Sequence, residues 1–278
     1  MTRALQSLTE IASDYDAIVF DQWGVLHDGT KPYPKAVRTL ETLKTSGVRM
    51  AVLSNSGKRA APNADRIVGM GFAPQLFETV MTSGEALWRD VKSSTVPAGL
   101  FYPIERSPGD AALWADGLSV DFTADIQMAE GVLLMGLPDG STLDDWHSKL
   151  DAALDQGLTI YCSNPDRKSP RKDGFVISPG ALAFAYQDMG GTTVFYGKPH
   201  RPIFASVEAA LGTDKLLMIG DSLEHDIAGA AASHWDSVLV QGGLYAKEFA
   251  GADPDQILSK LISENDYIAP TFRMEMVQ

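Results

Sequence analysis

The sequence has little of three things: cysteine, basic residues and long apolar runs. A single cysteine, Cys162, excludes a disulfide bond within the chain, and its place at the end of an apolar run predicts a small buried core residue. The 23 Lys and Arg residues are outnumbered by 36 Asp and Glu residues, which gives a formal net charge of −13. Nucleic acids and anionic membranes are held largely by clustered Lys and Arg, so we expect neither as a partner.

No apolar run approaches the ~20 residues that a membrane-spanning helix needs. Residues 1–16 contain polar and acidic side chains throughout and lack the unbroken apolar stretch of a secretory signal. We therefore expect a cytoplasmic protein. Hydrophobic residues make up 45% of the 278 residues and charged residues 21%, which is the balance of an ordinary globular chain with one large domain or two.

Short apolar runs that end in polar or Gly-rich turns alternate with helical patterns. The runs expected to form strands are 17–20, 49–53, 131–135, 158–162, 216–219 and 237–240. The stretches with apolar residues at helical spacing are 34–46, 144–156 and 202–211. Continuous apolar strands that alternate with helices predict an α/β fold with parallel sheets, in which ligands bind at the carboxyl ends of the strands. Residues after Pro270 carry little pattern and are expected to be mobile.

Polar residues follow three of the apolar runs. Asp21 follows the first run, Ser54 and Asn55 follow the second, and Asp221 follows the run 216–219, with Asp226 five residues further on. Two carboxylates in one loop repel each other unless a cation lies between them, and hard oxygen ligands favour magnesium over zinc. Each residue alone also fits a structural part: a turn former for Asp21, a Ser-Asn-Gly turn, or a helix cap for Asp226.

Lys198, in the segment YGKPH, completes a characteristic order of motifs, although taken alone it also fits an exposed lysine. The order is an Asp, then Ser-Asn, then Lys-Pro, then Gly-Asp with a further Asp. The chain resembles the haloacid dehalogenase (HAD) superfamily of hydrolases, whose four motifs occur in this order, over nearly its whole length. It is most similar to class IIA, the subgroup with a type II cap that includes NagD-like and 4-nitrophenyl or pyridoxal phosphatase-like proteins.

Three segments between and beside the motifs support this subgroup. They are MTSG at 81–84, CSNPDRKSPRKDGFVISPGALA at 162–183 and GKPHRPIFASVEAALG at 197–212. About thirty residues separate the first two motifs, whereas the second and third lie far apart, which places the cap insertion between Ser54 and Lys198. The resemblance implies a Rossmann-like core formed by 1–83 and 191–278, with an α/β cap domain at 84–190 and a homodimer through the cap.

The resemblance also implies a role for each motif residue. Asp21 would be the nucleophile that forms a phospho-aspartyl intermediate, and it would also bind Mg²⁺. Ser54 and Asn55 would bind the transferring phosphoryl group. Lys198 would neutralise charge on that group and on Asp21. Phosphoryl transfer needs positioning and charge stabilisation more than covalent chemistry, which these residue types supply.

The remaining metal ligands and the substrate contacts come from other segments. The resemblance implies that Asp221, Asp226 and the backbone carbonyl of Trp23 also bind Mg²⁺. It implies that Asn164 and Asp166 contact the substrate. The basic stretch around Arg167–Lys172 could steer an anionic substrate or be a solvated loop.

The first motif departs from the Asp-x-Asp pattern of the phosphatases, because it is Asp21-Gln22-Trp23. The second Asp normally protonates the leaving oxygen, and such general acid–base help is worth roughly 100–10,000-fold. Three interpretations follow. His27, whose unperturbed pKa lies near neutrality, could replace the acid, or it could be a surface histidine of the loop. The enzyme could act only on good leaving groups or through water. The chain could instead bind a phosphorylated ligand without turnover.

The function that the sequence predicts best is a magnesium-dependent hydrolase of a small phosphorylated metabolite, such as a sugar phosphate or a nucleotide. The alternative is a weak or silent phosphate-binding protein on the same scaffold. A metal-free dehalogenase fits less well, because Asp221 and Asp226 are both present and dehalogenase caps usually lie between the first two motifs.

Overall fold

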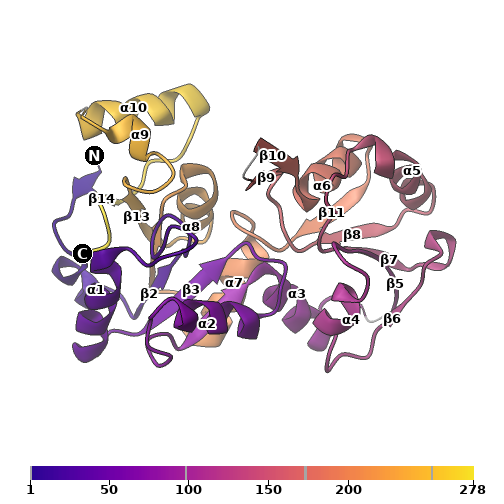
Figure 1. Ribbon diagram of the computed structural model, residues 1–278, viewed down its shortest axis with the longest axis horizontal. Helices are drawn as coiled ribbons and strands as arrows, with labels where there is room; N and C mark the ends of the chain where they lie inside the picture. The colour runs from indigo at the N-terminus through magenta and orange to yellow at the C-terminus, as the bar shows by residue number, and fades with distance from the viewer. Residues whose placement is uncertain (1, 98, 172–173, 252) are drawn as a thin grey trace. The chain divides into compact units, whose positions relative to one another are not determined.

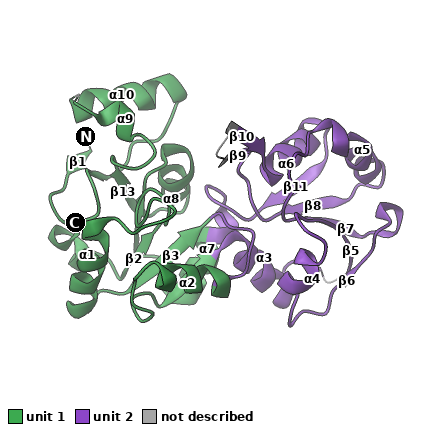
Figure 2. Cartoon of the chain, viewed as in Figure 1, with its two compact units in different colours: residues 1–54, 61–81, 204–278 green, residues 55–60, 82–203 purple. Residues whose placement is uncertain are grey.

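The computed structural model describes residues 2–97, 99–171, 174–251 and 253–278 (Figure 1). The chain divides into two compact units (Figure 2). Unit 1 comprises residues 1–54, 61–81 and 204–278, and unit 2 comprises 55–60 and 82–203. Among the described residues, no helix is long and apolar enough to cross a membrane.

Unit 1 is built on a seven-stranded sheet with the order β1-β14-β13-β12-β2-β3-β4. Its strands are β1 (Arg3–Ala4), β2 (Ala17–Phe20), β3 (Met50–Ser54), β4 (Thr79–Thr82), β12 (Leu216–Gly220), β13 (Asp236–Val240) and β14 (Phe272–Met274). The pairs from β1 through to β3 are all parallel. Every residue of β2 and β12 is buried, as expected for central strands of a parallel sheet with both faces covered.

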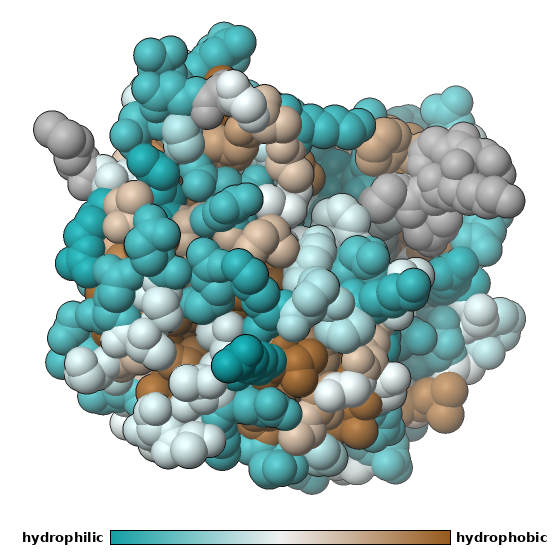
Figure 3. Space-filling view, turned by 60° about the vertical axis from the view of Figure 1, so that its left-hand side comes forward, coloured by the Kyte–Doolittle hydropathy of each residue, from teal (hydrophilic) through white to brown (hydrophobic). Residues whose placement is uncertain are grey.

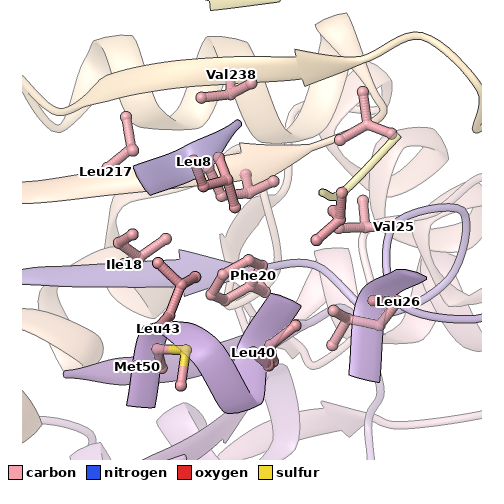
Figure 4. Packing of buried hydrophobic residues seen from close by; sticks show 14 of the residues in the cluster. Leu8, Ile18, Phe20, Val25, Leu26, Leu40, Leu43, Met50, Leu217 and Val238 are labelled. Atoms are coloured by element: carbon pink, nitrogen blue, oxygen red, sulfur yellow. The ribbon is translucent and has the colours of Figure 1, made fainter. Parts of the chain in front are cut away.

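Helices surround this sheet. They are α1 (Pro34–Thr45), α2 (Ala60–Gly69), α7 (Arg201–Leu211), α8 (Ala228–Ala232), α9 (Ala246–Phe249) and α10 (Pro254–Asn265). Helix α1 starts with a proline at its first turn, where no hydrogen bond is lost. Figure 4 shows its Leu40 and Leu43 next to Ile18 and Phe20 of β2. Each such fully buried side chain contributes about 1.5–3 kcal/mol by removal from water, which holds β2 rigidly in the sheet.

The C-terminal segment is an ordered part of unit 1, so the expectation of a mobile tail was wrong. Strand β14 pairs with both β13 and β1, and Val277 is buried. The backbone N–H of Leu8 donates to the carbonyl of Gln278 at 3.0 Å. The tail has a weak sequence pattern because its strand has only three residues and its stability comes from neighbours far away in the chain.

Unit 2 has a five-stranded parallel sheet with the order β11-β8-β7-β5-β6 and a two-stranded antiparallel ribbon. Its strands are β5 (Leu100–Ile104), β6 (Asp121–Phe122), β7 (Gly131–Leu134), β8 (Thr159–Cys162), β9 (Lys168–Arg171), β10 (Gly174–Ile177) and β11 (Thr192–Phe195). Its helices are α3 (Ser83–Lys92), α4 (Asp110–Trp114), α5 (His147–Asp155) and α6 (Pro179–Asp188). A separate core of buried residues lies against this sheet.

Short turns complete both units. The 3₁₀ turns are Leu8–Glu10, Ala12–Asp14, Ile126–Met128 and Asp144–Trp146, and a π turn covers Leu223–Ile227. On the face shown in Figure 3, hydrophobic residues occur singly or in small groups among hydrophilic ones.

The predicted α/β class with parallel sheets is confirmed. The unit boundaries differ from the predicted segments 1–83, 84–190 and 191–278, because β11 pairs with β8 and therefore belongs to unit 2. The residue at which a compact unit ends does not show what that unit does. The assignment of 84–190 as a cap over the active site stays a prediction.

Candidate functional site

The carboxyl ends of neighbouring strands in unit 1 bring three predicted site residues to one edge of the sheet. Strands β12, β2 and β3 are adjacent and parallel, with Ile219 opposite Phe20 and Phe20 opposite Val52. Asp221, Asp21 and Ser54 lie at the ends of these strands. The N–H of Asp21 donates to the carbonyl of Ile219 at 2.9 Å, which fixes the start of the first motif beside β12.

Three carboxylates converge at this edge. One oxygen from each of Asp21, Asp221 and Asp226 lies within 4.8 Å of the others. Asp221 is 4% exposed and Asp226 is 1% exposed. The Oδ2 atom of Asp226 accepts the backbone N–H groups of Asp221 and Ser222, at 3.2 and 3.1 Å. The π turn at Leu223–Ile227 thus directs Asp226 back towards the strand end, instead of leaving it as an outward helix cap.

The backbone approaches these carboxylates so closely that side chains would not fit. Gly24 has φ +83, and a Cβ on it would lie 1.8 Å from Oδ2 of Asp221. A Cβ on Gly243 would lie 2.4 Å from Cβ of Asp221, and one on Gly220 would lie 2.2 Å from Cβ of Asp226. The glycines therefore form a cradle in which both carboxylates are held.

This arrangement fits a hard divalent cation. Buried carboxylates are costly unless they are paired or bind metal, and three of them together repel one another. The ligand atoms are all carboxylate oxygens, which is the donor type that Mg²⁺ prefers. The carbonyl of Trp23 has no described contact, so its place among the ligands stays a prediction.

A loop that the sequence analysis missed braces Asp221. The N–H of Leu244 donates to Oδ2 of Asp221 at 2.8 Å. The chain is held there by the C-terminal tail, because Gln241 and Gly242 donate backbone hydrogen bonds to the carbonyls of Met274 and Glu275. The signal in the sequence was the pair of glycines that follows the apolar run 237–240 after one intervening residue, Gln241, at a strand end of the same edge.

Unit 2 holds the other predicted residues in a connected group. Lys198 is 4% exposed, so it is not an ordinary surface lysine. Its backbone N–H donates to Oδ1 of Asn55 at 2.7 Å, and Nδ2 of Asn55 donates to Oδ1 of Asp166 at 2.9 Å. The N–H of Asp166 in turn donates to Oδ1 of Asn164 at 2.9 Å. Four candidates from three segments of the chain are thus linked by hydrogen bonds.

The loop after Asp21 contains the two residues that bear on acid catalysis. Trp23 is 51% exposed, whereas His27 is 1% exposed, so the interpretation of His27 as a surface residue was wrong. Nδ1 of His27 accepts the N–H of Gly29 at 3.0 Å, which leaves the imidazole proton on Nε2, and that atom has no partner among the described residues. Burial, and secondly the charge of Arg66, lower the pKa of His27, so the ring is neutral at neutral pH.

Two further sequence-based interpretations concern residues around β8 and β9. Cys162 is fully buried, as predicted, and its thiol donates to the carbonyl of Asn164. Of the basic stretch, Lys172 lies outside the described residues. The Arg167 guanidinium lies 3.8 Å from the ring centroid of Phe184, so this cation has an aromatic partner within unit 2.

Comparisons with known proteins agree with this arrangement. Residues 18–105 match the family model described as haloacid dehalogenase-like hydrolase, and residues 195–269 match the HAD-hydrolase-like model. The 5'-nucleotidase YutF of Bacillus subtilis is 24% identical over 261 residues, which cover 91% of this chain and 98% of YutF. The acid sugar phosphatase of Staphylococcus aureus is 27% identical over 241 residues, covering 84% of this chain and 89% of that protein.

A solved structure extends the match to the whole chain. The crystal structure of a hydrolase of the haloacid dehalogenase-like family from Brucella suis is 27% identical, with a TM-score of 0.76, and the match covers 99% of this chain and 100% of that one. Because the two family models match both halves of the sequence and these relatives match it nearly from end to end, the chain belongs to the haloacid dehalogenase superfamily of hydrolases, in class IIA.

Proposed function

We propose that this protein is a magnesium-dependent phosphatase of a small phosphorylated metabolite, and that Asp21 forms an aspartyl-phosphate intermediate. The observation that carries the proposal is the convergence of Asp21 with Asp221 and Asp226 within 4.8 Å at the carboxyl end of a parallel sheet. The activities of two relatives, a nucleotidase and a sugar phosphatase, support a phosphate monoester as substrate and a sugar phosphate or nucleotide as its class.

In the proposed reaction a carboxylate oxygen of Asp21 attacks phosphorus, and the bond to the leaving oxygen breaks. A water molecule then cleaves the acyl phosphate, which releases inorganic phosphate and restores Asp21. Ser54 donates its hydroxyl to a phosphoryl oxygen, and Lys198 offsets the negative charge there. Asp21, Asp221, Asp226 and the Trp23 carbonyl would hold Mg²⁺, whose positive charge would offset the repulsion between the Asp21 carboxylate and the phosphoryl oxygens.

The residues in unit 2 would act on the rest of the substrate. Asn164 and Asp166, which the hydrogen bond between them orients, are proposed to contact the leaving group. The homodimer through residues 84–190 also stays a proposal, and light scattering on the purified protein tests it.

The leaving group is where this chain departs from its relatives' motif. The indole N–H of Trp23 is far too weak an acid to protonate the leaving oxygen, and His27 is buried with a lowered pKa. The leaving oxygen must then take its proton from water, which favours substrates whose leaving group is stable as an anion, such as aryl phosphates.

The absence of a carboxylic acid at Trp23 also favours a second candidate, a protein that binds a phosphorylated ligand without turnover. The two candidates differ in the effect of Asp21→Asn, because the substitution removes the nucleophile but keeps the shape of the side chain. An enzyme loses turnover, whereas a binding protein keeps its affinity for the ligand.

The test is phosphate release from p-nitrophenyl phosphate and a panel of sugar phosphates and nucleotides, with Mg²⁺ or with a chelator. We expect magnesium-dependent release that Asp21→Asn abolishes. Asp266→Asn is the matched control, because Asp266 is exposed in unit 1 and its left-handed conformation, φ 54, suits Asn. Phosphate release that persists in the chelator or in Asp21→Asn contradicts the mechanism. Release that persists in the chelator but is lost in Asp21→Asn would favour a metal-free reaction.

A further inference from the structure

The side chain of Asn55 is engaged at both of its amide atoms, although the sequence suggested that it binds phosphate. Oδ1 accepts the backbone N–H of Lys198 at 2.7 Å. Nδ2 donates to the backbone carbonyl of Lys198 at 3.3 Å and to Oδ1 of Asp166 at 2.9 Å. An Asn amide has two N–H donors, and these two acceptors use both of them.

The contact with Lys198 is specific for main-chain position. The amide of Asn55 forms hydrogen bonds with both the N–H and the C=O of Lys198, so a shift or rotation of the Lys198 backbone breaks at least one of them. Lysine carries its ammonium on a flexible four-carbon stem and acts as a point charge. The place of its main chain therefore sets the region that the ammonium can reach, and Lys198 has little room to compensate because it is 4% exposed.

Close packing leaves Asn55 little freedom to shift. A Cβ on Gly197 would lie 2.8 Å from Oδ1 of Asn55 and 2.2 Å from Cδ of Pro165. The same glycine therefore allows Asn55 to approach Lys198 and the Asn164–Asp166 loop together. The three segments meet at one amide group, across sequence separations of 111 residues to Asp166 and 143 residues to Lys198.

We propose that Asn55 is a positioning residue that fixes Lys198 and Asp166 relative to each other and so sets where the lysine charge meets the substrate. The inference rests on the proposed function, because it takes Lys198 as the residue that offsets phosphoryl charge. It assigns to Asn55 an indirect role: its side chain acts through Lys198 and not by contact with phosphate.

A double-mutant cycle tests this inference on the full-length protein. The variants are Asn55→Ala, Lys198→Ala and the two together, measured as kcat and KM for p-nitrophenyl phosphate with Mg²⁺. Misplacing a catalytic group by about 1 Å can cost on the order of 100-fold, so we expect Asn55→Ala to lower kcat by roughly 10–100-fold. In the Lys198→Ala background the same change should cost less than about twofold, since residues that act as a unit are not additive.

A second variant perturbs the group without removing the amide. Gly197→Ala places a methyl group against Oδ1 of Asn55, so it should lower kcat in the same direction and should also have little effect once Lys198 is replaced. Asn265→Ala, an exposed asparagine of α10 in unit 1, is the control and should keep wild-type kcat. Far-ultraviolet circular dichroism and the thermal midpoint show which variants are folded.

The affinity for inorganic phosphate, measured by isothermal titration calorimetry, separates the inference from the proposed function. Wild-type protein that binds phosphate without turnover overturns the phosphatase proposal alone, and the cycle is then read from the phosphate Kd. If Asn55→Ala changes kcat or the phosphate Kd by the same factor with Lys198 present as with Lys198 replaced, the two effects are additive and the inference alone is overturned. A wild-type protein with neither turnover nor phosphate binding overturns both.

Discussion

A methyl group on Gly24 would occupy the space of the Asp221 carboxylate. A Cβ built on Gly24 lies 1.8 Å from Oδ2 and 2.7 Å from Cγ of Asp221, far inside van der Waals contact. Gly24→Ala must therefore push this carboxylate aside. Oδ2 of Asp221 also accepts the N–H of Leu244 at 2.8 Å, so the displacement breaks that hydrogen bond as well.

Gly47 offers a matched control in the same unit. Gly24 and Gly47 have nearly the same φ, +83 and +82, but a Cβ on Gly47 meets nothing within 4 Å. An Ala in this left-handed region costs about 1–2 kcal/mol, and both variants carry that cost. Gly24→Ala also loses a hydrogen bond to a charged group, worth about 1.5–3 kcal/mol, so it should be destabilised by roughly 2.5–5 kcal/mol in total.

The difference between the variants should be larger in function than in stability. Because Asp221 is a proposed metal ligand, we expect Gly24→Ala to lose magnesium-dependent turnover by about 100-fold or more, while Gly47→Ala keeps it. Urea unfolding gives the free energies, and magnesium titrations of p-nitrophenyl phosphate hydrolysis give the activity. Wild-type activity and magnesium dependence in a folded Gly24→Ala protein, or equal losses in both variants, would refute the reasoning.

Three other predictions concern single side chains. Trp23→Asp should raise turnover of alkyl phosphates by about 100–10,000-fold, with Trp23→Ala as the control that does not, because only the carboxylate can protonate the leaving oxygen; no gain would mean that the acid is not limiting. His27 has a lowered pKa in the folded state, so below about pH 6.5 the unfolded chain takes up a proton at this residue that the folded protein does not. The free energy of unfolding should therefore fall as the pH is lowered, by up to about 1.4 kcal/mol per pH unit. Urea unfolding of His27→Gln should lack this contribution to the pH dependence. Burial raises the pKa of the Cys162 thiol to about 12, so Ellman's reagent should react only as the protein unfolds, and fast reaction of native protein would contradict the buried position.

The core strands and the order of the site residues could be predicted because their signal is local. The run AIVF forms β2, and the run LLMI with Gly220 forms β12; each of these strands is directly followed by the predicted carboxylate. A strand buried on both faces must be apolar throughout, so the sequence alone marks it. Since parallel strands present their carboxyl ends at one edge, the convergence of Asp21 with Asp221 followed from the fold class.

The parts that sequence reasoning missed depend on partners far away in the chain. The segment 272–274 reads as irregular because its apolar character is slight, yet it pairs with β13 and β1. Its backbone then braces the loop that donates to Asp221. The side-chain partners of Asn55, Asp166 and Lys198, lie more than a hundred residues further along, so the Ser-Asn turn by itself does not show them.

The proposed metal site and the position that the acid occupies in the Asp-x-Asp motif are separable in this chain, because they depend on different groups. The carboxylate cluster needs the backbone path through Gly24 and the side chains of Asp21 and Asp221, none of which involves the indole of Trp23. Replacing the acid by Trp23 therefore leaves the proposed magnesium site intact, since a backbone carbonyl does not depend on the side chain beside it. Gly24→Ala tests the metal site while keeping the loop's side chains, and Trp23→Asp tests the acid while keeping the cradle. If the proposed mechanism is right, the first change lowers turnover on every substrate, whereas the second changes only the dependence on the leaving group.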